Sequence, residues 1–169
     1  SLMDIVSGIK DRGLDMPVLL RIENILDSQI TLIHENFGNA IRNLGYNGVF
    51  KGVYPIKVNQ QREVVEEVTK FGARYHHGLE VGSKAELIAA LSFLRNPKAC
   101  LICNGYKDQD YIDLALYACK MGFLCFMVLE MPSELPLILD RAKALGIKPR
   151  IGVRIKVSTQ AGGHWAESA

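Results

Sequence analysis

The stretch that decides the fold is residues 99–129, ACLICNGYKDQDYIDLALYACKMGFLCFMVL. It begins and ends with continuous apolar runs, 100–103 and 123–129, whose lengths are those of strands, and 108–121 between them has the pattern of a helix. A strand that is apolar throughout is buried on both faces, as in a parallel sheet covered by helices. The stretch therefore predicts a β-α-β unit of a parallel α/β fold.

The same unit recurs on both sides of this stretch. Strands are expected at 50–58, 74–80, 99–104, 123–129 and 149–157, and helices at 60–71, 83–95, 108–121 and 133–145. Upstream, the pattern predicts an N-terminal helix through Ile9, a short strand at 17–21, and a helix at 25–44 that Gly45 ends.

Two architectures fit this alternation: an open doubly wound sheet or a (β/α)8 barrel. Polar residues stand at the ends of all five predicted strands, namely Lys57 with Asn59, Glu80, Asn104, Glu130 and Arg154. In a barrel such ends converge on one mouth, whereas in a doubly wound sheet they spread along an edge. The pattern favours the barrel, and no Gly-x-Gly-x-x-Gly follows the first strand.

A complete barrel takes about 250 residues, so this chain accounts for about five of eight strands. We expect a helical and strand lead-in at 1–45, a partial (β/α)8 TIM-type barrel at 46–157, and a loop-like, truncated end at 158–169.

The composition is that of an ordinary globular protein, with 49% hydrophobic and 22% charged residues and a net charge of +2. No basic stripe points to nucleic acid, and no apolar run approaches the ~20 residues of a membrane span. We expect a cytoplasmic protein that binds neither nucleic acid nor membrane.

The cysteines offer two pairs. Cys100 and Cys103 lie three apart in a predicted strand, so their thiols point to opposite faces. Cys119 and Cys125 span a helix-to-strand join. We interpret all four as buried apolar cysteines and expect neither a metal site nor a disulfide.

Lys57 ends the run 50–59, FKGVYPIKVN. An ammonium at the end of an apolar strand is poorly solvated, which lowers its pKa and makes the amine a nucleophile able to form Schiff bases. The alternative is a lysine that reaches from the strand end into water.

Five blocks, taken together, resemble one family. The run 52–60, GVYPIKVNQ, resembles the cofactor-lysine segment of biosynthetic arginine decarboxylases, which use pyridoxal phosphate and share the fold of alanine racemase. The blocks 78–87 (GLEVGSKAEL), 103–108 (CNGYKD) and 152–156 (GVRIK) match further blocks in order, and 17–21 (PVLLR) is typical of the arginine enzymes. The resemblance covers nearly the whole chain.

The resemblance implies roles for four residues. Lys57 would bind the cofactor covalently, Glu80 would lie beside its ring, and Arg154 would lie under the cofactor. Glu86 would lie near Lys57 and Arg154. The alternatives from the residues alone are a solvated carboxylate for Glu80, a surface ion pair for Arg154, and a capping box in which Ser83 and Glu86 start a helix.

Other polar residues give weaker signals. Asn59 and Asn104 commonly cap turns. His76 and His77 are adjacent in a predicted strand and so point apart. The family's ring-stacking histidine lies beyond the fifth strand, where His164 cannot be aligned, and Gly162-Gly163 reads better as an active-site loop than as a phosphate site.

The resemblance implies decarboxylation of L-arginine to agmatine and CO2 for polyamine (putrescine and spermidine) synthesis, with magnesium and a homo-oligomer in the full enzyme. Alternatives are a decarboxylase of the same fold acting on diaminopimelate, lysine or carboxynorspermidine, and a non-catalytic binding homologue. The phosphate loops, the acidic partner of the pyridine nitrogen and the C-terminal β domain find no match here, so the chain alone is expected to be inactive or nearly so.

Overall fold

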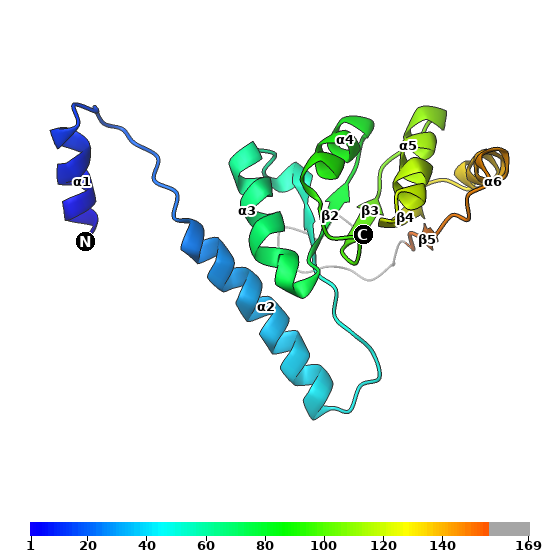
Figure 1. The fold of residues 1–169 in the computed structure, drawn as a ribbon, viewed down its shortest axis with the longest axis horizontal. Coiled ribbons are helices and arrows are strands. Elements are labelled where there is room, and N and C mark those ends of the chain that lie inside the picture. Colours follow the sequence, from blue (N-terminus) through cyan, green and yellow to red (C-terminus); the bar gives the residue numbers. More distant parts are fainter. Residues whose placement is uncertain (156–169) are drawn as a thin grey trace.

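The computed structural model describes residues 1–155, which contain one five-stranded parallel sheet (Figure 1). The strands are β1 (Val53–Pro55), β2 (Gly78–Val81), β3 (Cys100–Cys103), β4 (Leu124–Leu129) and β5 (Ile151–Val153). The helices are α1 (Leu2–Asp11), α2 (Glu23–Asn43), α3 (Arg62–Gly72), α4 (Lys84–Phe93), α5 (Gln109–Lys120) and α6 (Glu134–Leu145), with short 3-10 turns η1 (Ile56–Val58) and η2 (Ala73–Tyr75). Helices α3 to α6 pack on the sheet, α2 packs on α3, and α1 lies apart from the sheet (Figure 1).

The spatial order of the strands decides between the two architectures that the sequence allows, the doubly wound sheet and the barrel. The spatial order is β1-β2-β3-β4-β5, with every neighbouring pair parallel. A doubly wound sheet reverses its strand order at a switch point, whereas a barrel adds each strand beside the one before it. Helices α3 to α6 all lie on one side of the sheet (Figure 1). The prediction of a partial (β/α)8 barrel is confirmed.

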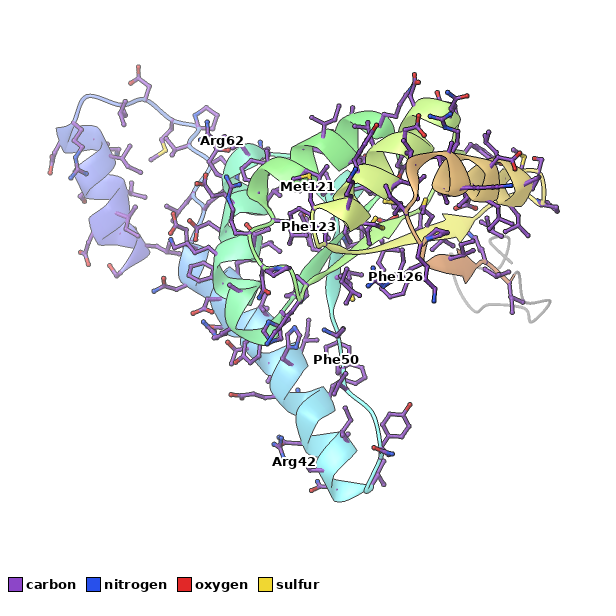
Figure 2. All side chains as sticks on the ribbon, turned by 45° about the vertical axis from the view of Figure 1, so that its right-hand side comes forward. Arg42, Phe50, Arg62, Met121, Phe123 and Phe126 are labelled. Atoms are coloured by element: carbon purple, nitrogen blue, oxygen red, sulfur yellow. The ribbon has the colours of Figure 1, made fainter. Side chains whose placement is uncertain are left out.

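The core lies between the sheet and these helices because alternate strand residues point toward them. Leu79, Leu101 and Cys125 are in register and have no exposed surface. Phe126, between the buried Cys125 and Met127, lies on the face away from the helices (Figure 2) and is in register with Ile102. The described sheet thus has one covered face and one open face.

Several predicted boundaries are wrong. Residues 17–21 form no strand, since no described strand pairs with them. The second strand begins only at Gly78, because 73–75 make a 3-10 turn and His76 takes a left-handed conformation with φ 56°. The first strand stops at Pro55, which has no N–H to extend the ladder, so Lys57 lies in the turn η1. Arg154 likewise follows β5, and Lys156 lies outside the described residues.

The cysteines are free and lie in or beside the core. Cys100 and Cys103 are buried, and the Sγ atom of Cys103 lies 3.6 Å from that of Cys125 on the next strand. The sequence offered no sign of this contact, because its partners are 22 residues apart. Cys119 contacts the carbonyl of Cys125 through its thiol, at 3.7 Å.

Candidate active site

One pocket of about 400 Å³ lies at the carboxyl ends of the strands. A polar side chain in or just after each of the five described strands lines it: Lys57, Glu80, Asn104, Glu130 and Arg154. Glu86, Tyr106 and two glycines, Gly82 and Gly105, complete it. The convergence predicted from the polar strand ends is therefore present. All four residues singled out by the resemblance face the same space, and their roles stay predictions.

Lys57 differs from its expected state. It is exposed, so the prediction of a poorly solvated ammonium is wrong for the part of the chain described. The 3-10 turn after Pro55 carries the side chain past the strand end and out of the apolar layer. Among residues 1–155 it makes no hydrogen bond or ion pair, which leaves its amine available to a ligand.

Glu80 is buried, with 8% of its surface exposed, so it is no solvated strand-end carboxylate. Its Oε1 accepts a hydrogen bond of 2.8 Å from the side-chain amide of Asn104 on the neighbouring strand. Asn104 is in turn fixed because its backbone N–H donates to Val81 at 2.8 Å and its carbonyl accepts from Tyr111 at 3.0 Å. The carboxylate therefore has a defined orientation.

Glu86 has a different partner from the one that a capping box predicts. Ser83 does cap α4, since its hydroxyl accepts from the Glu86 N–H at 3.2 Å. The Glu86 carboxylate, however, accepts from the N–H of Gly82 at 2.7 Å and from the Gln60 amide at 3.1 Å. It thereby joins the loops that follow β1 and β2.

Arg154 forms an ion pair with Glu130, both of whose carboxylate oxygens lie 3.3 Å from Nη1. The side chain of Arg154 is 67% exposed and that of Glu130 only 13%. Glu130 also accepts from the Gly105 N–H at 3.0 Å. The arginine is thus held from one side, and within residues 1–155 its other N–H donors have no partner and could meet an anionic group.

The turn after β3 needs glycine. Gly105 has φ 74°, and a Cβ there would lie 2.2 Å from the carbonyl oxygen of Gly82. Only a residue without a side chain lets the loops after β2 and β3 approach this closely. Tyr111 supports both loops from below through its hydroxyl, which donates to Val81 at 3.2 Å and to Asn104, and burial raises the pKa of this phenol.

Charged groups at the helix starts flank the pocket. Lys84 pairs with Asp108 at 2.6 Å across the starts of α4 and α5. This hydrogen bond lowers the pKa of Asp108 and raises that of Lys84, so both stay charged near neutral pH.

Sequence reasoning noted Glu130 only as a polar strand end and missed Tyr106. It also missed Lys107 and Glu134, a buried pair behind the pocket. His76 and His77 do point apart, though not from a strand: His76 contacts Asn96 and His77 contacts His34. His164 and Gly162-Gly163 lie outside the described residues. Within 1–155 no group of three or more His, Cys, Asp or Glu is placed to hold a metal, and no helix is long and apolar enough to cross a membrane.

The family model described as pyridoxal-dependent decarboxylase, pyridoxal binding domain, matches residues 30–169. The chain belongs to this family. Relatives of the chain include the biosynthetic arginine decarboxylases of Synechococcus sp. (strain RCC307), 48% identical, and Gloeobacter violaceus, 49% identical. Each match covers 99% of this chain and 26% of the relative. The chain therefore spans about a quarter of the length of these curated relatives.

Solved structures agree with the family assignment. The biosynthetic arginine decarboxylase SpeA from Campylobacter jejuni is 36% identical, with a TM-score of 0.86 over 94% of this chain and 27% of that one. A diaminopimelate decarboxylase from Helicobacter pylori is 22% identical, with a TM-score of 0.58 over 86% of this chain and 33% of that one, which supports the fold alone.

The residues of the pocket fit the cofactor of this pyridoxal-dependent family. An aldehyde needs an accessible amine, and Lys57 supplies one without a competing partner among the described residues. When bound, pyridoxal phosphate supplies an aldehyde that captures amines and a ring that withdraws electrons from an amino acid. Glu80, Glu86 and Glu130 present fixed carboxylates around that amine, and Arg154 presents a guanidinium.

Proposed function

We propose that the protein to which these residues belong decarboxylates L-arginine to agmatine and CO2, with pyridoxal phosphate bound covalently at Lys57. The observation that carries the proposal is an accessible lysine amine without a described partner, in a pocket lined by a polar side chain in or just after each of five successive strands. Identity of 45–49% to several biosynthetic arginine decarboxylases supports arginine as the substrate. Residues 46–157 would be part of the cofactor-binding barrel, after a lead-in at 1–45.

Each pocket residue has a proposed task. Lys57 would act as the nucleophile through Nζ. Glu80, whose Oε1 is occupied by Asn104, would offer Oε2 to the cofactor. Arg154, held by Glu130, would donate N–H groups to an acceptor on the cofactor or substrate. Glu86 would keep the loops after β1 and β2 together through Gly82 and Gln60.

Borohydride reduction tests the covalent role. The full-length protein is mixed with pyridoxal phosphate, reduced, digested and analysed by mass spectrometry. We expect the added mass on the peptide that contains Lys57 and its loss in Lys57→Ala. Lys51→Ala is the matched control, since Lys51 is also an exposed lysine near β1 but donates to the Lys98 carbonyl outside the pocket. Equal labelling of the Lys57→Ala protein would contradict the assignment.

Release of CO2 from a panel of substrates tests the reaction. L-arginine, diaminopimelate, L-lysine and carboxynorspermidine are supplied to the full-length protein. Preference for arginine supports the proposal, and preference for another substrate would replace it with a different decarboxylase of the same fold. A protein that neither takes up label nor releases CO2 would be a binding homologue.

Further predictions from the resemblance concern the whole protein. We propose a cytoplasmic homo-oligomer whose product enters polyamine synthesis, with magnesium as a further requirement. Size-exclusion chromatography with light scattering tests the assembly, and activity after chelation tests the metal. The 169-residue chain alone is expected to release little or no CO2.

A further inference from the structure

A buried ion pair lies behind the pocket and lines no part of it. The side chains of Lys107 and Glu134 are 0% and 2% exposed, and their Nζ and Oε2 atoms lie 3.5 Å apart. Moving two charges out of water costs free energy that their attraction often does not recover. A contribution to stability alone is therefore a poor explanation for this buried pair. Its other hydrogen bonds show which parts of the backbone the two side chains hold together.

Glu134 joins two loops through its two carboxylate oxygens. Oε1 accepts from the backbone N–H of Lys107 after β3, and Oε2 accepts from that of Glu130 after β4, each at 2.9 Å. A carboxylate can accept at both oxygens, whereas an amide side chain accepts at one and donates at the other. This bridge needs a carboxylate.

Lys107 makes the reciprocal connection. Its Nζ donates to the carbonyl of Gly105 at 2.7 Å and to that of Val128 in β4. With Glu134 as the third partner, all three N–H groups of the ammonium are directed at acceptors. Lys107 thereby links the turn after β3 to β4 through hydrogen bonds to both.

These contacts lead directly to the pocket. Glu130, whose N–H is held by Glu134, uses its carboxylate to accept from the Gly105 N–H and to pair with Arg154. We propose that Lys107 and Glu134 are positioning residues that fix Glu130, and through it Arg154, for the reaction. The catalytic part of this inference rests on the proposed decarboxylase function, and the positional part does not.

Two variants of the full-length protein separate positioning from stability. Glu134→Gln places an N–H₂ donor against one of the two backbone N–H groups and leaves Lys107 charged. The double variant Lys107→Met with Glu134→Gln removes both buried charges, which relieves the uncompensated charge but keeps the mismatched amide. The matched control is Arg141→Met with Asp113→Asn. It removes an ion pair of 2.7 and 2.8 Å between α5 and α6 that lies outside the pocket.

Hydrogen exchange followed by mass spectrometry measures how firmly the two loops are held, and it does not depend on the protein's activity. We expect peptides covering 104–108 and 129–134 to exchange faster in Glu134→Gln and in the double variant, while the control resembles the parent. Decarboxylation is measured over a range of arginine concentrations at saturating cofactor, which gives kcat and KM separately. We expect kcat to fall about 10- to 100-fold in both Glu134→Gln proteins, because displaced groups lose transition-state contacts, with a smaller change in KM.

The outcomes are distinct. If the double variant regains thermal stability but not kcat, and its two loops stay unprotected, positioning is supported. If kcat returns together with stability, or if both loops and kcat are unchanged in Glu134→Gln, the inference is wrong. If the parent protein releases no CO2 from arginine, the proposed function fails, and the exchange comparison still decides whether the pair fixes the two loops.

Discussion

The stability of the fold should depend on pH through His77. Its Nδ1 lies 2.9 Å from the Nε2 of His34 on α2, at the amino ends of β1 and β2. His34 also stacks on Tyr75 with ring centroids 4.6 Å apart. Burial, followed by the charge of His34, lowers the pKa of His77 to about 4, from the ordinary value of 6.5. Protonating His77 therefore opposes the packing of α2 against the segment that leads into β2.

The direction and size follow from linkage. Between pH 4 and 6.5 the unfolded chain binds a proton at His77 that the folded chain does not. The free energy of unfolding is thus unaffected well above pH 6.5. It decreases as the pH falls below 6.5, and the full decrease is reached below pH 4. With these two pKa values, the free energy of unfolding falls by about 2 kcal/mol between pH 7 and pH 5.

Urea unfolding followed by circular dichroism at pH 7, 6 and 5 measures this loss. In His77→Gln we expect the fall in the free energy of unfolding between pH 7 and pH 5 to be smaller by about 2 kcal/mol than in the parent, since the amide does not titrate. His76→Asn is the matched control. It changes the adjacent histidine, whose φ of 56° asparagine tolerates, and should keep the parental dependence. If the loss of unfolding free energy from pH 7 to pH 5 differs by less than about 0.5 kcal/mol between the parent and His77→Gln, the reasoning is refuted.

Three substitutions around the pocket test its architecture by urea unfolding. Gly105→Ala should cost at least about 2 kcal/mol, because of its positive φ and the 2.2 Å approach to Gly82, and a smaller loss would argue against this close approach. Tyr111→Phe should cost about 1–2 kcal/mol by removing a hydroxyl that bridges two loops, and an unchanged midpoint would mean that the bridge contributes nothing. Ser83→Ala should cost about 1 kcal/mol as a lost helix cap, and Ser92→Ala in the same helix is its control.

The parts of the fold that the sequence predicted well are those with a local signal. The runs that became β3 and β4 are apolar at every position, and this marks them as strands without knowledge of their neighbours, although the described residues cover only one face of the sheet. The site was predictable for a related reason. Polar residues that follow such strands must lie at the carboxyl edge, so the meeting of Lys57, Glu80 and Arg154 follows from topology.

What the sequence did not predict depends on partners that are distant along the chain. Residues 17–21 are apolar enough for a strand, but no described strand pairs with them. Lys107 and Glu134 are 27 residues apart, and each alone resembles an ordinary charged residue at a helix start. Only the arrangement of β3 beside β4 makes them a buried pair. The exposure of Lys57 depends likewise on where Pro55 ends the first strand.

The pocket combines side chains that are held by hydrogen bonds or an ion pair with one, Lys57, that has no partner among the described residues. Glu80, Asn104 and Glu130 come from the three central strands and are held by hydrogen bonds of 2.8–3.0 Å to side chains or backbone. Lys57 follows the outer described strand β1 and is exposed, whereas Arg154, after β5, is exposed but is paired with Glu130. A nucleophile must move between partners during a reaction, whereas groups that orient a cofactor should not. Substitutions of Glu80, Asn104 or Glu130 should therefore weaken the binding of every ligand of the pocket. Substitution of Lys57 should abolish the proposed covalent step while leaving the pocket's shape intact.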